Sequence, residues 1–293
     1  DTLLSPGGEH GMPGAVSLSR RERAADEAIT VVVRARPLER KQKPAWRVTP
    51  EEGSIAIANA AALRRSTAFF GPDGNVRAST ASGDNPGHFR FDAVFGEGAT
   101  TSEIYSGHLR RIVGSALEGI NGTIFAYGQT GSGKTFTIVG NKSSPGVVPM
   151  AVADVFDRVR GDAGCDYAIR VGMLEIYNEE LKDLLAPPGS SLSAARLQVK
   201  EDPEFGVVVA GMSEEVVTEQ ERVRKLIDRG NTRRQTGATK MNEESSRSHT
   251  IVRMVIESRD KSDPDGAVKV STLSFVDLAG SERLNKSGAE GIR

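Results

Sequence analysis

The stretch "GQTGSGKT" at residues 128–135 decides the fold class of this chain. Gly, four variable residues, Gly-Lys and Thr form the pattern of a phosphate-binding loop between a β-strand and an α-helix. Glycines let the backbone turn its N–H groups toward phosphate oxygens, and the helix N-terminus favours negative charge. Lys134 supplies a cation to the β- and γ-phosphates, and the hydroxyl of Thr135 is a ligand for Mg²⁺.

A Gly-rich linker that matches the pattern by chance is the alternative interpretation. The sequence before the loop argues against it, because "TIFAYG" at 123–128 is an apolar run typical of a buried strand. A phosphate-binding loop needs a strand before it and a helix after it. The sequence therefore predicts a phosphate site at the end of this strand.

The rest of the chain shows strand and helix patterns in alternation. Thr218 and Glu221 have the spacing of a capping box, and Gly230 is predicted to end the helix that starts there. Alternating strands and helices predict an α/β fold, a mixed central β-sheet flanked by helices on both faces. The predicted strands cover 28–34, 123–128, 167–178, 249–257 and 268–277, and the predicted helices cover 102–120, 149–159 and 218–230.

The composition excludes several classes of protein. The formal net charge of the 293 residues is −1, so no overall field attracts a polyanion, and we expect no nucleic acid partner. No apolar run approaches the roughly 18 residues of a membrane span. Cys165 is the one cysteine and cannot form an internal disulfide, which is typical of a reducing, cytoplasmic compartment.

A second loop follows the strand in "STLSFVDLAGSER" at 271–283. Asp277 ends that strand, where it can hold Mg²⁺ through water, and the N–H of Gly280 can contact a γ-phosphate because no side chain blocks the approach. An ordinary Asp-Gly turn is the alternative, since turns use both residues freely.

A third loop, "NEESSRSH" at 242–249, is rich in side chains that disfavour a helix interior. Ser245 and Ser246 can reach the γ-phosphate, Mg²⁺ and the attacking water, and Arg247 adds a charge that can switch partners. A solvated loop before a strand is the alternative.

Taken together, the three loops resemble the phosphate loop, switch I and switch II of kinesin motor domains, in the same order and with similar spacing. "RARP" (34–37), "GTIFAYG" (122–128) and "LEIYNE" (174–179) are also similar to kinesin segments. "PAWRV", "SPGVVP" and "TKMNEESSRSHTIVRMVIESR" most resemble the centromere-associated (CENP-E-like) branch. The resemblance covers residues 28–293 and implies a P-loop NTPase kinesin-motor fold that hydrolyses ATP with Mg²⁺.

The resemblance also assigns residues to roles. Arg34, Arg36, Pro37 and Phe136 are expected to flank the adenine, although a core position is the alternative for Phe136. Arg247 and Glu282 are expected to form an ion pair over the γ-phosphate, and His249 is expected to serve packing or loop support rather than proton transfer. The expected nucleotide-binding set also contains Gly128, Gln129, Thr130, Gly131, Ser132, Gly133, Lys134, Thr135, Asn242 and Ser245; the catalytic set is Ser246, Arg247, Gly280 and Glu282; and the Mg²⁺ set is Thr135, Ser246 and Asp277, the last through water.

The implied partner is the microtubule, at the cytoskeleton and, in a mitotic role, at the spindle or kinetochore. Contacts are expected around 200–211 and in the loop with Lys286, Ser287 and Arg293, although charges there can equally belong to a solvated face. A dimer is expected through a coiled coil outside this sequence. The rivals are a scaffold that binds microtubules and nucleotide without turnover, and a GTPase or myosin-like relative, which "RARP" disfavours.

The chain starts at Asp1, and we expect a C-terminally truncated motor domain that stops in the loop after switch II. Such a chain is expected to be a poor microtubule-stimulated ATPase that cannot move along microtubules. Residues 1–27 are expected to be a disordered extension, and 58–87 a loop insertion.

Overall fold

The structure is a computed structural model that describes residues 29–39, 42–58, 88–187, 197–203, 206–237, 247–263 and 265–282. The predicted extension at 1–27 and all but the first residue of the predicted insertion at 58–87 lie outside these residues. The chain forms two compact units. The smaller one comprises Asp1–Val33 and Lys43–Val94, and the larger one comprises Arg34–Gln42 and Phe95–Arg293.

The smaller unit holds a three-stranded antiparallel sheet in the order β2-β3-β4. Its strands are β2 (Trp46–Thr49), β3 (Ser54–Ile57) and β4 (His88–Arg90), and the short helix η1 (Pro50–Glu52) joins the first two. None of the predicted site residues lies in this sheet. Of the described residues 29–34 of the strand predicted at 28–34, β1 (Val32–Arg34) is regular, and it pairs with β5 (Ala93–Phe95).

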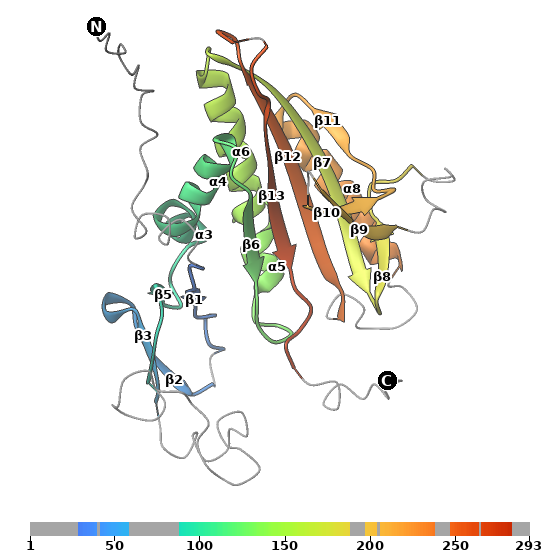
Figure 1. The fold of residues 1–293 in the computed structure, drawn as a ribbon. Coiled ribbons are helices and arrows are strands. Elements are labelled where there is room, and N and C mark those ends of the chain that lie inside the picture. Colours follow the sequence, from blue (N-terminus) through green and yellow to red (C-terminus); the bar gives the residue numbers. More distant parts are fainter. Residues whose placement is uncertain are drawn as a thin grey trace, which may run out of the picture. The chain divides into compact units, whose positions relative to one another are not determined.

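The larger unit is built on a central sheet in the order β11-β7-β12-β13-β6, with β8 added beside β7 (Figure 1). Of its pairs, β13 and β6 run parallel and the others antiparallel, which confirms the predicted mixed sheet. A separate hairpin pairs β9 (Gln198–Asp202) with β10 (Gly206–Ala210). The strands of the central sheet are β6 (Gly122–Ala126), β7 (Cys165–Tyr177), β8 (Glu180–Asp183), β11 (Glu215–Val217), β12 (His249–Asp260) and β13 (Lys269–Asp277).

The helices of this unit pack on one face of the central sheet. Side chains alternate between the two faces of a strand, and Met173, Met254 and Phe275 point into a core that also holds Val113 and Val155 from the helices. Within the described residues we find no helix on the other face, where one layer of helices was also predicted. The helices are α3 (Thr101–Ile104), the π-helix η2 (Tyr105–Leu109), α4 (Arg110–Leu117), α5 (Lys134–Ile138), α6 (Val147–Gly161) and α8 (Gln220–Gly237).

Two predicted helix boundaries were wrong for physical reasons. Helix α6 begins at Val147, two residues before Pro149, because proline is tolerated within a first helical turn. Helix α8 continues past Gly230 to Gly237. A Cβ on Gly230 would lie 2.3 Å from Sδ of Met173, so this glycine lets the helix approach β7 closely and does not end the helix. No helix among the described residues is long and apolar enough to cross a membrane.

Two glycines allow the chain to fold tightly between α5 and α6. A Cβ on Gly140 would lie 2.2 Å from the backbone nitrogen of Gly146. A Cβ on Gly146 would lie 2.4 Å from the backbone carbon of Val139 and 2.5 Å from the carbonyl oxygen of Ile138. Because these obstacles are backbone atoms, a larger residue would have to move the chain itself.

We therefore expect Gly146→Ala to lower the free energy of unfolding by about 2 kcal/mol, the range of overpacked sites. Gly161→Ala is the matched control, since a Cβ at Gly161 meets no atom within 4 Å. Denaturant titration measures both variants. Equal stability of Gly146→Ala and Gly161→Ala would show that the crossing is not tight.

Candidate functional site

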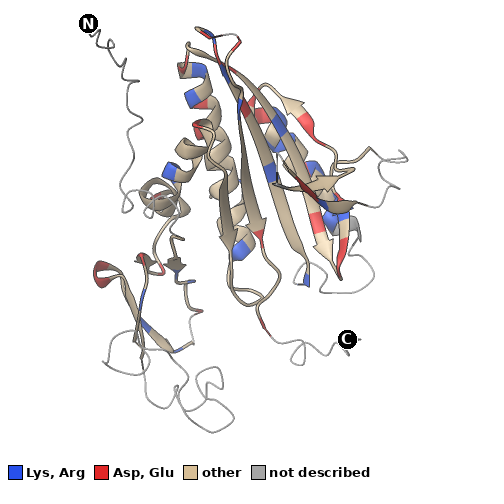
Figure 2. Cartoon of the chain, viewed as in Figure 1, with Lys and Arg blue, Asp and Glu red and all other residues tan. Residues whose placement is uncertain are grey.

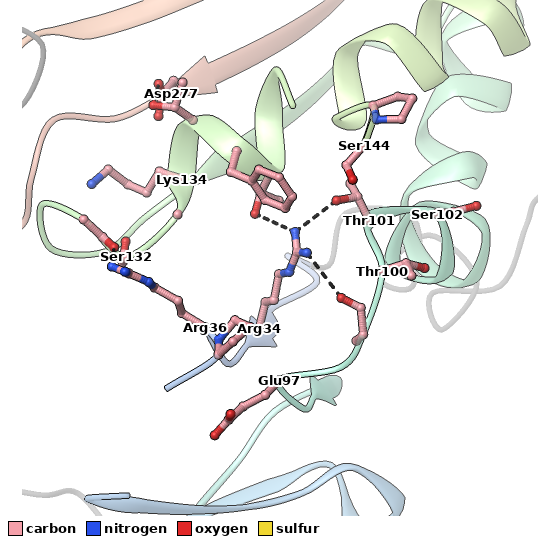
Figure 3. A pocket seen from close by; sticks show the side chains of 18 of the residues that line it. Arg34, Arg36, Glu97, Thr100, Thr101, Ser102, Ser132, Lys134, Ser144 and Asp277 are labelled. Carbon is pink, nitrogen blue, oxygen red and sulfur yellow. Dashed lines mark hydrogen bonds between the residues drawn. The ribbon is translucent and has the colours of Figure 1, made fainter. Parts of the chain in front are cut away.

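A cavity of about 860 Å³ opens in the larger unit beside the phosphate loop, and Figure 3 shows its side chains. It lies between the loop with α5, the segment after β1 and the start of α3. The structure brings together most of the residues predicted for the nucleotide. Those that line the cavity are Arg34, Arg36, Pro37, Thr130, Gly131, Ser132, Gly133, Lys134, Thr135, Phe136 and Asp277.

Other predicted residues do not line this cavity or are not described. Gly128, Gln129, Gly280, Glu282 and Arg247 are described and do not line it. Asn242, Ser245 and Ser246 of switch I, and Lys286, Ser287 and Arg293, lie outside the described residues.

The phosphate loop owes its shape to glycines. Gly128, Gly131 and Gly133 have φ angles of 154°, 77° and 98°, a backbone region that other residues rarely adopt. Gly133 caps the N-terminus of α5, so the positive end of this helix lies at the cavity. The ammonium of Lys134 donates hydrogen bonds to the carbonyls of Gly128 at 2.8 Å and Gln129 at 3.0 Å.

A hydrogen bond joins the phosphate loop to the end of β13. Thr135 Oγ1 donates to Oδ2 of Asp277 at 2.6 Å. The other carboxylate oxygen of Asp277, Oδ1, is buried and has no hydrogen-bond partner among the described residues. A hydroxyl beside a buried carboxylate oxygen supplies the hard oxygen ligands that Mg²⁺ prefers, directly or through water, so these residues fit the ion.

A buried arginine lies behind this pair. Arg234 on α8 places Nε 3.3 Å from the carboxylate of Glu175 and Nη1 3.7 Å from that of Asp277. Its Nη2 donates a hydrogen bond at 3.2 Å to Oγ of Ser248, the residue that follows Arg247 in the chain. The side chains of Arg234, Glu175 and Asp277 are 10% exposed or less. Arg234 was not predicted as a site residue, because the helix was predicted to end four residues earlier, at Gly230.

The loop after β13 stays attached to the phosphate loop. The N–H of Leu278 donates to the carbonyl of Ala126 at 3.4 Å, and that of Ser281 to the carbonyl of Gly128 at 3.1 Å. The N–H of Ala279 donates to Nδ1 of His249 at 3.1 Å. His249 thus accepts a hydrogen bond from the loop after β13.

The carboxylate of Glu282 lies on the phosphate loop. It accepts a hydrogen bond from the N–H of Thr130 at 2.9 Å and another from the Thr130 hydroxyl. These two bonds lower the pKa of Glu282, which keeps the carboxylate charged near neutral pH. A Cβ on Gly280 would lie 2.4 Å from both carboxylate oxygens, so a larger residue there would displace the Glu282 side chain from Thr130. The predicted ion pair of Glu282 with Arg247 stays a prediction.

The aromatic ring of Phe136, on α5 directly after Thr135, also lines the cavity. Its side chain is 40% exposed and lines the cavity, so the alternative of a core position is wrong. The guanidinium carbon of Arg34 lies 5.2 Å from the centre of this ring. Arg36 donates to the carbonyl of Gly131 in the phosphate loop.

A family model described as the kinesin motor domain matches residues 34–293 of the chain. The chain belongs to the kinesin motor domain family. A solved structure of a fast kinesin superposes with a TM-score of 0.74 at 33% sequence identity, covering 90% of this chain and 69% of that one. The predicted fold class is therefore confirmed.

Curated kinesins show the same relationship in sequence. Kinesin-like protein KIN-7O of Arabidopsis thaliana is 42% identical over 276 residues, which are 91% of this chain and 19% of the relative. Centromere-associated protein E of Homo sapiens is 40% identical over 273 residues, which are 92% of this chain and 9% of that protein. This kinesin sequence thus spans about a fifth or less of the length of these two relatives.

The buried network around Arg234 gives a stability prediction. Arg234→Met leaves the carboxylates of Glu175 and Asp277 buried without their cation, so we expect a loss of about 3 kcal/mol in the free energy of unfolding. Arg224→Met is the matched control on the same helix, because the Arg224 side chain is 61% exposed. Denaturant titration of the two variants makes the comparison. A cost for Arg234→Met no larger than that for Arg224→Met would contradict the network.

Proposed function

We propose that this kinesin chain binds Mg²⁺ and ATP in the cavity and hydrolyses ATP to ADP and phosphate as part of a microtubule motor. The observation that carries the proposal is the hydrogen bond between Thr135 and Asp277. This bond brings together a hydroxyl and a carboxylate, the two groups that a phosphoryl-transfer site uses around Mg²⁺. The hydroxyl comes from the phosphate loop, and the carboxylate from the start of the loop expected to sense the γ-phosphate.

The phosphate loop binds the triphosphate. The ammonium of Lys134 now bonds two loop carbonyls, and phosphate oxygens are stronger acceptors for a cation because they are charged. Lys134 then turns to the β- and γ-phosphates while the N-terminus of α5 faces the same anions. Gly128, Gln129 and the following residues up to Gly133 shape the loop around the phosphates.

Thr135, Asp277 and Ser246 are the proposed residues around the metal, with Asp277 acting through water. Bound Mg²⁺ neutralises charge on the phosphate oxygens during transfer. The hydroxyl of Thr135 donates a hydrogen bond to Asp277, so the lone pairs of the hydroxyl oxygen stay available to the metal. Asn242 and Ser245 are proposed to complete the nucleotide contacts from switch I.

The base fits against the apolar end of the cavity. Phe136 offers an exposed aromatic face, and Pro37 lines the same cavity. Aromatic rings stack on bases through their π-faces. We propose that adenine lies beside these two residues, next to the guanidinium groups of Arg34 and Arg36.

Hydrolysis requires a gate over the γ-phosphate. We propose that Arg247 and Glu282 pair when the γ-phosphate orders both loops, with the N–H of Gly280 as a further contact. The carboxylate of Glu282 accepts two hydrogen bonds from Thr130, which hold it on the phosphate loop. Closure of the gate would position the attacking water.

The proposed partner is the acidic surface of the microtubule, since the solved fast kinesin is described through its ATPase mechanism and its interactions with microtubules. The β9–β10 hairpin falls in the segment predicted for contact and exposes Val199 and Val207 by 59% and 71%. Figure 2 shows Lys and Arg interspersed with Asp and Glu over the larger unit, so local patches have to make the contact. The likeness to centromere-associated protein E supports a mitotic place at the spindle or kinetochore, and dimerisation through a coiled coil is part of the same proposal.

Lys134→Ala is expected to abolish nucleotide binding, because Lys134 is the one cationic side chain in the sequence 128–135. Titration with a fluorescent ATP analogue measures the affinity. Lys182→Ala on β8 is the matched control and should bind like the wild type. If Lys134→Ala binds the analogue as tightly as the wild type, this loop is not the phosphate site.

The gate gives a separate prediction. Arg247→Ala and Glu282→Ala should each leave ATP binding nearly intact and slow hydrolysis severely, because each removes one partner of the closing pair. The charge swap Arg247→Glu with Glu282→Arg should recover part of the rate. Single-turnover phosphate release in a complete motor domain is the measurement, and a wild-type rate for Glu282→Ala would contradict the gate.

A further inference from the structure

We propose that Arg34 is a positioning residue for the phosphate end of the cavity and that it does not select the base. It acts by holding α5, the short helix that begins with Lys134 and Thr135. This inference rests on the proposed function, because it concerns how the same cavity binds a nucleoside triphosphate.

The guanidinium of Arg34 donates hydrogen bonds to two segments of the protein, the start of α3 with the residues just before it, and α5 (Figure 3). Its Nη1 donates to the hydroxyls of Thr101 and Thr137, each at 3.0 Å, and its Nη2 donates to the carbonyl of Ala99 at 3.2 Å. A guanidinium has five N–H donors in a fixed plane, and three of them are used here. The group is thus fixed in orientation by Ala99 just before α3, by Thr101 at the start of α3 and by Thr137 in α5.

Two of the contacts of Arg34 reach α5. Thr137 accepts its hydrogen bond, and Phe136, the preceding residue, lies with its ring 5.2 Å from the guanidinium carbon. Both residues belong to the same helical turn as Lys134 and Thr135. Arg34 therefore contacts the helix that carries the two side chains expected to bind the phosphates and Mg²⁺.

The helix needs such contacts because it has only five residues. Helices this short are unstable by themselves in water. On the side of the sheet, the bond from Thr135 to Asp277 fixes α5. On the cavity side, Arg34 fixes it through Thr137 and Phe136. Without Arg34, the helix keeps one of these two anchors, and Lys134 and Thr135 lose their fixed direction.

The two roles of Arg34 predict different dependence on the base. If Arg34 reads adenine, its substitution lowers the affinity of the protein for ATP and leaves the affinities for other nucleoside triphosphates unchanged. If Arg34 positions α5, its substitution lowers the affinity for every nucleoside triphosphate by the same factor, because all of them share the three phosphates. The ratio of affinities for ATP and CTP separates these cases.

The experiment measures binding of ATP, GTP and CTP with Mg²⁺ to the full chain by competition against a fluorescent ADP analogue. Thr137→Val removes the hydroxyl and keeps the shape, and Thr137→Ser restores the hydroxyl. Arg34→Met removes the guanidinium. Thr232→Val on α8 is the matched control, since the exposed Thr232 hydroxyl donates to the helix carbonyl of Asp228 and lies in another helix.

We expect Arg34→Met to weaken all three nucleotides by the same factor of about ten, and Thr137→Val by about three, as for one or two hydrogen bonds to a charged group. Thr137→Ser and Thr232→Val should bind like the wild type. A loss for ATP that exceeds the loss for CTP threefold overturns the inference, and so does an unchanged affinity in both Arg34→Met and Thr137→Val. A wild type that binds no triphosphate contradicts the proposed function itself.

Discussion

The hydrogen bond of 2.6 Å from Thr135 to Asp277 is the contact on which the rest of the site depends. It joins the segments that leave β6 and β13, the parallel pair of the described central sheet. Parallel neighbours end at the same edge of a sheet, and ligands of α/β folds bind in the crevice outside such carboxyl ends. The fold therefore brings the phosphate loop and the loop after β13 together.

Two arginines stabilise this junction from different sides. Arg234 lies in the interior, where it compensates the buried carboxylates of Asp277 and Glu175. Arg34 lies at the cavity and binds the outer side of α5. A buried carboxylate without a cation is costly, and a five-residue helix without anchors is unstable. Both arginines thus protect the geometry of residues that are expected to touch the nucleotide.

The sequence predicted the parts of the site that are local in the chain. Gly128, Gly131 and Gly133 hold the positive φ angles that the phosphate-loop pattern requires, and Lys134 and Thr135 follow them on a helix. The mixed sheet followed from strand and helix patterns in the same way. These features depend on residues that are close together in the sequence, so a short sequence pattern is enough to predict them.

What the sequence did not predict depends on contacts between distant residues. Gly230 has the local pattern of a helix end, but its role is to let α8 pack closely on Met173, because a side chain there would clash. Arg234 then fell outside the predicted helix, and its partner Glu175 lies 59 positions earlier in the chain. The contact between Glu282 and Thr130 spans 152 positions and was not predicted from the sequence.

The central claim is that the junction of Thr135 and Asp277 belongs to an ATPase that works on microtubules. Steady-state phosphate release from ATP by the intact protein, measured over a range of microtubule concentrations, tests it most directly. The account predicts a slow basal rate that needs Mg²⁺ and rises to a plateau as microtubules are added. Phosphate release that is absent, or that does not change with microtubules, would contradict it.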